Sequence, residues 1–413
     1  MHFNEVKRLF LSLQNLCFYV FKLGICLNQT NRWQNKNMIP FLDLKKINEP
    51  YETAFQEKLK LVLDNGWYIL GKEVETFEKA LAEYCQTQYC IGVGNGFDAL
   101  VLIFKGYIQL GKLQKGDEVI VPANTYIASI LAILQADLIP VLVEPKLETY
   151  NIDPDLIQQK INSKTKAILV VHLYGQLAEM DKINQIAFDN DLIIVEDAAQ
   201  SQGAFGNYNN FKSQIPNKDV RENNLKSAIA HSFYPGKNLG CLGDGGAVTT
   251  NDAELTKALF SLRNYGSEKK YYNEYIGVNS RLDELQAAFL NVKLPNLNLD
   301  NDKRRAIAKR YLSEIKNDKI MLPFWDLSNN HVFHLFVIRT SNREDLQAYL
   351  TQNDIQTVIH YPVPPHQQKA LKDFNNLSFP ITEKIHNEVL SLPISPVLTD
   401  GEVSFIVAVL NRY

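Results

Sequence analysis

The chain has 413 residues, a length that predicts two or three domains and leaves ample chain for a hydrophobic core. It carries 43 Lys and Arg against 46 Asp and Glu, a formal net charge of -3, with 22% charged and 46% hydrophobic residues. This balance is typical of an ordinary soluble globular protein and disfavours disorder or a basic nucleic-acid-binding face. The five cysteines form no C-x-x-C pair and no Cys/His cluster at zinc spacing, so we expect reduced thiols, a cytoplasmic location and no structural metal.

Residues 1–37 differ from the rest of the chain. The stretch 9–27 is apolar and aromatic, but it contains Lys22 and barely matches the ~20 residues of a membrane span. It also lacks the clear cleavage site of a signal peptide. We therefore predict an atypical extension, either an upstream start or a dispensable arm, ahead of a globular enzyme that begins at Met38. A membrane anchor is the alternative.

From Tyr89 onward, short apolar runs rich in β-branched residues alternate with helical patterns. The runs are CIGVG (90–94), EVIVPA (118–123), IPVLVE (139–144), AILVVH (167–172), LIIVEDA (192–198) and GGAVTT (245–250). Runs that are apolar at nearly every position suit strands buried on both faces. The pattern predicts an α/β fold with a mainly parallel central sheet covered by helices.

After about Asn291 the pattern changes. A charged helical stretch (302–315) precedes the apolar run HVFHLFVIR (331–339), which favours a second, smaller α/β unit. We predict a large domain over 38–290 and a small C-terminal domain over 291–413.

Two segments are expected to be irregular. Residues 207–224 lack apolar periodicity and suggest a surface excursion. HYPVPPH (360–366) is expected to be an extended loop, because its three prolines disfavour helix, and His366 to be a loop or surface residue. The charged run 302–310 is expected to be a solvated helix face.

The strongest local signal is HSFYPGKNLGCLGDGGAVTT (231–250). A single Lys237 lies between turn-forming residues and is followed by four glycines before a strand. Glycines permit positive φ angles and close approach of the backbone, so such a loop can surround a flat ligand and present one amine to it. The alternative is a hairpin-like turn with a solvated lysine.

VEDAAQ (195–200) follows an apolar strand, so at least one carboxylate should lie at the carboxyl edge of the sheet, where ligands of open α/β sheets bind. A buried carboxylate needs a cationic or hydrogen-bonded partner. Pyridoxal phosphate enzymes pair an Asp with the pyridine nitrogen and a Lys with the aldehyde, which Asp197 and Lys237 could provide. The alternative for Asp197 is an ordinary helix N-cap.

Two further motifs follow strands. GVGNGFDAL (92–100) is a strand, a glycine turn and a helix start, whose free amides can bind phosphate, although Phe97 replaces the third glycine of a dinucleotide loop. In PANTYIAS (122–129), Tyr126 could lie on the face of an aromatic cofactor. The alternative is a core tyrosine at the start of a helix.

Six motifs together resemble the DegT/DnrJ/EryC1/StrS family of nucleotide-sugar aminotransferases. They are, in the order of the family, GNGFDAL, PANTYIAS, HLYGQ (172–176), EDAAQS, HSFYPGKNLGCLGDGGA and NEYIGVNSRLDELQAAFL (273–290). The resemblance runs from about Ile39 to Leu410 and implies the fold-type-I architecture of pyridoxal-phosphate-dependent transferases. FYPGKNLG and IHYPVPPH resemble the branch that aminates dTDP-3-keto-6-deoxyhexoses, with glutamate as the expected donor. A related branch carries His in place of Lys237 and deoxygenates its substrate, so the lysine favours transamination.

The resemblance also implies roles for single residues. Lys237 would link to the cofactor and, once released, move the proton of the reaction, while Asp197 would face the pyridinium nitrogen. The other expected cofactor contacts are Gln200 at the phenolic oxygen, Tyr126 on the ring, and Gly96, Phe97 and Ser232 at the phosphate. A homodimer with shared active sites would complete the phosphate site with Asn279 of the partner subunit. Tyr234, His360 and Tyr361 would contact the sugar or the nucleotide.

The resemblance leaves two alternatives to a 3-aminotransferase of dTDP-sugar and polysaccharide biosynthesis. One is amination at C4 of a 4-keto nucleotide sugar. The other is a noncatalytic cofactor-binding regulator on the same fold. In each case the partners are small molecules and a second copy of the chain, and neither a nucleic acid nor a membrane is expected.

Overall fold

The structure is a computed structural model that describes residues 38–206, 227–269 and 271–413. The predicted extension (1–37) and the predicted excursion (207–224) lie outside the described residues.

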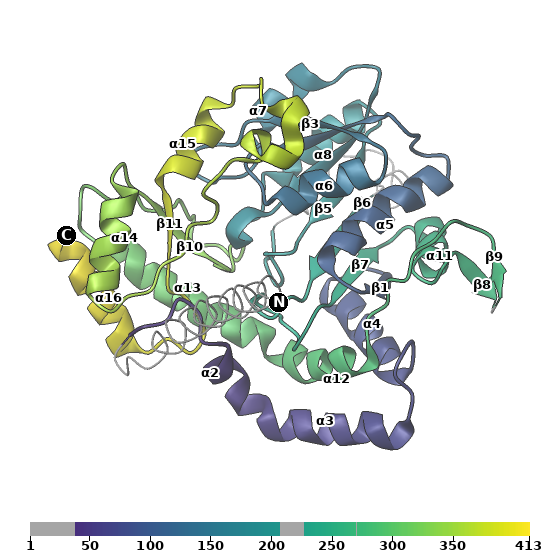
Figure 1. The fold of residues 1–413 in the computed structure, drawn as a ribbon, viewed down its shortest axis with the longest axis horizontal. Helices are drawn as coiled ribbons and strands as arrows, with labels where there is room; N and C mark the ends of the chain where they lie inside the picture. Colours follow the sequence, from purple (N-terminus) through teal and green to yellow (C-terminus); the bar gives the residue numbers. More distant parts are fainter. Residues whose placement is uncertain (1–37, 207–226, 270) are drawn as a thin grey trace, which may run out of the picture.

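A seven-stranded sheet forms the centre of the structure, in the order β1-β7-β6-β5-β4-β2-β3 (Figure 1). Its strands are β1 (Tyr89–Val93), β2 (Glu118–Pro122), β3 (Ile139–Val143), β4 (Thr165–Val171), β5 (Ile193–Asp197), β6 (Ser227–Ser232) and β7 (Gly246–Thr250). The neighbours from β3 to β6 are parallel, whereas β7 is antiparallel to both β6 and β1. The prediction of an α/β fold with a mainly parallel sheet is confirmed. β6 is the strand of this sheet that the apolar runs did not predict, because its sequence SAIAHS has a single large apolar residue, Ile229.

Helices enclose the sheet and the C-terminal part of the chain. They are α2 (Leu44–Asn48), α3 (Glu52–Asn65), α4 (Lys72–Tyr84), α5 (Gly96–Gln109), α6 (Ile127–Gln135), α7 (Pro154–Ile157), α8 (Met180–Asp189), α11 (Ala253–Leu262), α12 (Glu284–Lys293), α13 (Leu297–Glu314), α14 (Arg343–Gln352), α15 (Pro380–Glu388) and α16 (Asp400–Arg412). Short 3₁₀ turns connect several of them: η1 (Glu49–Tyr51), η2 (Gln158–Lys160), η3 (Leu173–Gly175), η4 (Leu294–Asn296), η5 (Pro365–Gln367) and η6 (Lys369–Phe374).

The two faces of β4 explain why its sequence is apolar from Ala167 to Val171. Ala167 and Leu169 belong to the core cluster that includes residues of α5, α6 and α11. Ile168 and Val170, between and beyond them, belong to a second cluster with residues of α8. Successive side chains of a strand point to opposite faces, so a strand covered by helices on both sides needs an apolar residue at every position.

The C-terminal part of the chain has its own core. The strands β10 (Phe336–Arg339) and β11 (Val389–Leu392) pair in antiparallel fashion, and apolar residues from them and from α13, α14 and α16 form one buried cluster. Figure 1 shows these elements at one end of the molecule and the short hairpin of β8 (Ser267–Lys269) and β9 (Tyr272–Asn273) at the opposite end. Ile39, at the other end of the described chain, joins the same cluster. The domain division at residue 290 remains a prediction.

Three local predictions are wrong. The 360–366 segment is not extended to its end, because a 3₁₀ turn begins at Pro365, where a proline at the first helical position is tolerated. His366 is fully buried against Glu383. The charged run of α13 is not wholly solvated, because Arg304 is buried and donates from Nη1 to the Ile394 carbonyl at 2.9 Å.

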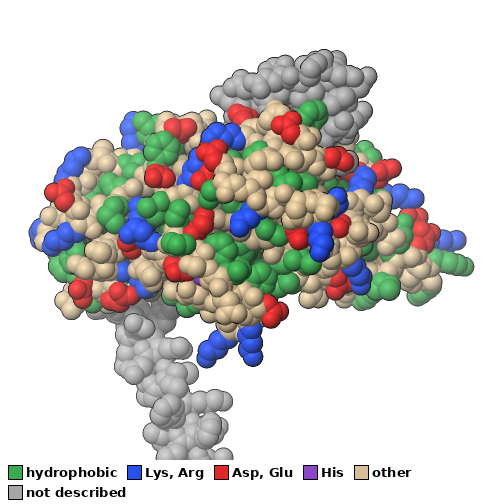
Figure 2. Space-filling view, turned by 90° about the horizontal axis from the view of Figure 1, so that it is seen from above, with side chains coloured by type: hydrophobic (Ala, Val, Ile, Leu, Met, Phe, Trp, Pro, Cys, Tyr) green, Lys and Arg blue, Asp and Glu red, His purple; other side chains and the backbone are tan. Residues whose placement is uncertain are grey.

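The surface carries mixed charge. On the face drawn in Figure 2, Lys and Arg side chains lie interspersed with Asp and Glu. Within residues 38–206, 227–269 and 271–413, no helix has the length and apolar character needed to cross a membrane. The same residues contain no cluster of three His, Cys, Asp or Glu side chains suited to a metal ion.

Candidate active site

A cavity of about 610 Å³ opens where β4, β5 and β6 end. The parallel register pairs Val171 with Asp197 and Asp197 with Ala230, so the residues that follow these strands meet at one edge. Ten of the predicted site residues line this cavity: Gly96, Phe97, Tyr126, Asp197, Gln200, Ser232, Tyr234, Lys237, His360 and Tyr361. Asn279 does not; it is exposed and forms an isolated bridge with Asn264.

The N-terminus of α5 forms one wall of the cavity. Asn95 caps the helix, accepting a hydrogen bond from the Asp98 amide at 2.8 Å. A Cβ atom at Gly96 would lie 2.5 Å from Cβ of Ser232, so only glycine lets the end of β6 approach the helix this closely. The Ser232 hydroxyl therefore lies beside the first helical amides, an arrangement suited to a phosphate group.

Asp197 is the last residue of β5 and is only 8% exposed. Its Oδ2 accepts a hydrogen bond from Ser129 Oγ at 2.8 Å, and its Oδ1 accepts one from the Ala199 amide at 3.1 Å. Thr125 Oγ1 lies 2.9 Å from Ser129 Oγ and extends the chain of hydroxyls. A turn follows Asp197 rather than a helix, so the N-cap alternative does not hold. Each carboxylate oxygen keeps a further lone pair for a cationic ligand group.

Lys237 lies in the turn after β6, where its amide donates to the Tyr234 carbonyl at 2.8 Å. Burial lowers the pKa of its amine to about 8, against the opposing effect of the Asp197 charge. Lys237 is partly buried and lines the cavity, which disfavours the alternative of a solvated lysine. The loop folds tightly, since a Cβ at Gly240 would lie 2.4 Å from the Pro235 carbonyl oxygen. Lys293 Nζ donates to the Gly240 carbonyl at 2.6 Å and anchors the loop from α12.

Gln200 joins the two sides of the cavity. Its Oε1 accepts from the Tyr174 amide at 2.6 Å, and its Nε2 donates to the Tyr361 hydroxyl at 3.1 Å. The ring of Tyr361 lies 5.1 Å from that of Tyr126. Tyr126 is 52% exposed, so it is not a core residue, and its ring is available to a ligand in the cavity.

Three histidines line the cavity. His172 has both nitrogens engaged, with Nδ1 accepting from the Ala178 amide at 3.2 Å and Nε2 lying 2.9 Å from Glu196 Oε2. His360 contacts Ser391 Oγ through Nδ1 at 2.9 Å, and burial together with the nearby Lys237 lowers the pKa of its imidazole to about 4. The third, His334, was not among the predicted site residues.

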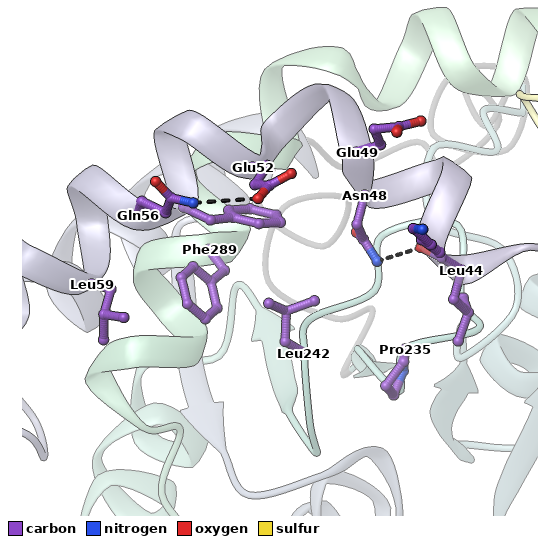
Figure 3. A pocket seen from close by; sticks show the side chains of 11 residues that line it. Leu44, Asn48, Glu49, Glu52, Gln56, Leu59, Pro235, Leu242 and Phe289 are labelled. Carbon is purple, nitrogen blue, oxygen red and sulfur yellow. Dashed lines mark hydrogen bonds between the residues drawn. The ribbon is translucent and has the colours of Figure 1, made fainter.

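A second hollow, of about 520 Å³, lies beneath α2 and α3 (Figure 3). Apolar side chains such as Leu59, Leu242 and Phe289 line it together with polar residues of the two helices. None of the predicted site residues lines this hollow.

Residues 50–411 match the DegT/DnrJ/EryC1/StrS aminotransferase family. The chain belongs to this family. A dTDP-3-amino-3,6-dideoxy-alpha-D-galactopyranose transaminase of Aneurinibacillus thermoaerophilus is 56% identical over 376 residues, which are 91% of this chain and 99% of the relative. The crystal structure of DesV of S. venezuelae superposes with a TM-score of 0.83 and 41% identity, covering 91% of this chain and 98% of DesV.

The DegT/DnrJ/EryC1/StrS family is pyridoxal-phosphate-dependent, and this member is a sugar aminotransferase. The crystal structure of NtdA of Bacillus subtilis, with the bound cofactor PMP, superposes with a TM-score of 0.81 and 33% identity and covers 92% of this chain and 86% of NtdA. The residues present fit such a cofactor. The α5 terminus and Ser232 suit its phosphate, and the buried Asp197 carboxylate, which has spare acceptor capacity, suits its ring nitrogen.

Three residues in or beside the cavity of this family member were not predicted from the sequence. Ser129 lies one helical turn after Thr125 in the motif that contains Tyr126, a spacing that could have revealed it. Tyr174 has a positive φ of 60° and donates from its hydroxyl to the His360 carbonyl, a role that no local pattern indicates. His334 lies inside the apolar run 331–339, which the sequence indicated only as part of a second, smaller α/β unit.

Proposed function

We propose that the protein transfers an amino group, with glutamate as donor, to C3 of a dTDP-linked 3-keto-6-deoxyhexose, forming the 3-amino-3,6-dideoxyhexose. The observation that carries this proposal is the 56% identity over 91% of the chain to a relative named for such an amino sugar. Intact Lys237 and Asp197, together in one cavity, disfavour the noncatalytic alternative.

Each cavity residue has a proposed task. When bound, pyridoxal phosphate supplies an aldehyde that carries amino groups and a ring that accepts electrons. Asp197, whose carboxylate is held by Ser129 and the Ala199 amide, would face the ring nitrogen and keep it protonated. The Lys237 amine would hold the cofactor through its aldehyde and, when free, would move the proton at the substrate carbon. Because burial lowers its pKa to about 8, the Lys237 amine can both take up and release a proton near neutral pH.

The remaining contacts follow from the positions of the side chains around the cavity. The Gly96 and Phe97 amides and the Ser232 hydroxyl would hold the phosphate of the cofactor. Tyr126 would contact its ring and Gln200 its phenolic oxygen, since all of these residues line the cavity. Tyr234, His360 and Tyr361, which line the rest of the cavity, contact the sugar or the nucleotide.

The active form is a homodimer in this proposal. Asn279 lies outside the cavity of its own chain and is exposed, which suits a residue that enters the phosphate site of a second copy. Ile276, three residues earlier, is 99% exposed, an unfavourable state for an isoleucine unless a partner covers it. The enzyme would act in the cytoplasm, within dTDP-sugar and polysaccharide biosynthesis.

The experiment that tests the substrate is incubation of the purified protein with glutamate and separately prepared 3-keto and 4-keto nucleotide sugars. The products are analysed by mass and by the position of the new amine. Amination of the dTDP-3-keto sugar is expected. Amination of the 4-keto sugar alone would replace the proposal by its first alternative, and binding of cofactor without turnover of either sugar would favour the regulator.

The shared site is tested by mixing Lys237→Ala and Asn279→Ala protomers. Each variant alone has two defective sites, whereas a mixed dimer contains one site with neither change. Partial recovery of activity on mixing is expected, and no recovery from demonstrably exchanged subunits would contradict the shared site.

A further inference from the structure

Ser280 directly follows Asn279, in the segment between α11 and α12, and is only 2% exposed. Its amide donates to the carbonyl of Arg263, the C-cap residue of α11, at 2.9 Å. The neighbouring Asn279 forms an isolated bridge with Asn264. The backbone of Ser280 is therefore fixed beside the end of α11 by contacts that do not involve its side chain.

The hydroxyl of Ser280 connects two residues at the start of α5. It accepts a hydrogen bond from the Gly94 amide at 2.9 Å and donates one to Oδ2 of Asp98 at 2.6 Å. Gly94 follows β1, and Asp98 lies in the first turn of α5. An amide N–H only donates and a carboxylate only accepts, so the direction of both bonds is determined. The amide, the hydroxyl and the carboxylate form one chain in which each bond strengthens the next.

The position of the Asp98 carboxylate matters to the phosphate site. The free amides at the start of a helix attract anions, and they attract a carboxylate of the first turn as well as a phosphate. The three residues before Asp98, which are residues 95–97, line the cavity, but Asp98 does not. Its carboxylate is bonded to Ser280 instead. The hydroxyl thus holds the one acidic side chain of this helix turn outside the cavity.

We propose that Ser280 is a positioning residue for the phosphate group of the cofactor, because its hydroxyl keeps the Asp98 carboxylate away from the Gly96 and Phe97 amides. The proposal rests on the phosphate site given under the proposed function. Without the hydroxyl, the carboxylate would turn toward these amides, compete with the phosphate for their hydrogen bonds and repel its charge. Ser280 does not line the cavity itself, so it acts through Asp98.

The test measures how much the phosphate group contributes to binding, a quantity that a purely structural role of Ser280 would not change. The full-length protein, freed of cofactor, is titrated separately with pyridoxamine phosphate and with pyridoxamine, and binding is followed by the fluorescence of the ligand. Neither ligand has an aldehyde that could link to Lys237, and only the first carries a phosphate. The ratio of the two dissociation constants therefore reports on the phosphate site.

Ser280→Ala should raise the dissociation constant of pyridoxamine phosphate about tenfold, the effect of losing one hydrogen bond to a charged group, and that of pyridoxamine by about twofold or less. Ser261→Ala is the matched control. Ser261 is also 2% exposed, but its hydroxyl has no hydrogen-bond partner in the part of the chain that the structure describes. The control should change neither constant by more than about twofold.

Two double variants show whether Ser280 acts through the Asp98 carboxylate. The neutral amide of Asp98→Asn does not repel the phosphate, so adding Ser280→Ala to it should weaken binding by about threefold or less. Adding Ser280→Ala to Asn279→Ala should still weaken binding about tenfold, because the contacts that place Asn279 are made by the backbone and remain.

Three results would overturn the proposal: an unchanged preference for the phosphorylated ligand in Ser280→Ala, the full loss in the Asp98→Asn background, or no further loss in the Asn279→Ala background. If Ser280→Ala does not fold, Ser280→Cys takes its place, because a thiol donates only weakly.

The phosphate site itself is tested by the unchanged protein, which should bind pyridoxamine phosphate about a hundredfold or more tightly than pyridoxamine. Equal binding of the two ligands would contradict the phosphate site of the proposed function. A large preference that survives Ser280→Ala would contradict only the role of Ser280.

Discussion

The two sides of the cavity differ in how their residues come to lie there. On the sheet side, Asp197 and Ser232 end neighbouring parallel strands and Lys237 follows five residues later, so the sheet register alone brings them together. On the opposite side, His334 and His360 come from segments of the C-terminal part of the chain. Their positions depend on how these segments pack against the residues that follow the central sheet strands. The comparison teaches that residues at strand ends can be predicted from local sequence. On the opposite wall, the family resemblance indicated His360 and Tyr361, and His334 was not predicted.

One group of contacts that holds the second side of the cavity in place is centred on a single carboxylate. Glu144, directly after β3, accepts hydrogen bonds from the Ile381 amide at 2.8 Å, the Thr382 amide at 3.0 Å and the Thr382 hydroxyl at 2.6 Å. These groups form the N-terminus of α15, whose residues lead into β11. The Glu144 carboxylate, at the end of β3, thus caps α15 in the C-terminal part of the chain.

The largest expected effect belongs to the sheet side. Asp197→Asn should lower the rate of transamination by about a hundredfold or more, because a neutral amide cannot hold a proton on the cofactor ring. Glu196→Gln is the matched control, the same chemical change one residue earlier in β5. Its amide oxygen can still accept from His172, so we expect a change within about threefold. Steady-state rates with saturating cofactor measure both, and equal losses would contradict the role of Asp197.

The connection between the sides has the next largest effect. Glu144→Ala should lower the free energy of unfolding by about 2 kcal/mol, since it leaves two helix-start amides and a hydroxyl without their acceptor. Glu148→Ala, at an exposed position four residues later, should change it by about 0.5 kcal/mol or less. Urea titration measures both variants. Equal stability of the Glu144→Ala and Glu148→Ala variants would contradict a stabilising contact between Glu144 and α15.

The smallest effect is a pH dependence of stability. Burial lowers the pKa of His386, in α15, to about 4 and that of His231, in β6, to about 4. Because the folded-state pKa lies below the unfolded value of 6.5, the unfolded chain binds more protons between these values. The contribution of these neutral histidines to the free energy of unfolding is therefore complete above pH 6.5 and is lost as the pH falls toward 4. When the pH falls from 7.5 to 5.5, each histidine should lower the free energy of unfolding by about 1 kcal/mol.

Urea titrations at the two pH values measure this loss. His386→Asn should show a smaller decrease than the unchanged protein, and so should His231→Asn, because each removes one of the contributing groups. If both variants lost as much stability between the two pH values as the unchanged protein, other groups would be responsible for the acid sensitivity.

Much of the fold and of the sheet side could be predicted from particular residues. The runs that became β2, β4 and β5 are apolar at nearly every position because helices cover both faces, and this burial is visible in the sequence itself. β6 was not predicted because Ile229 is its only large apolar residue, and its place in the sheet depends on pairing with β5 and β7.

The sequence by itself determined the class of fold, the sheet-edge lysine and aspartate and the family, because these depend on short-range patterns of burial and glycine. Tertiary structure alone decided that Ser129 supports Asp197, that His366 and Arg304 are buried, and that His334 lines the cavity. It also decided the chain of side-chain contacts that joins residues 202, 301, 238 and 334. The physical reason is that hydrogen-bond partners far apart in the chain are chosen by packing, which no local pattern records.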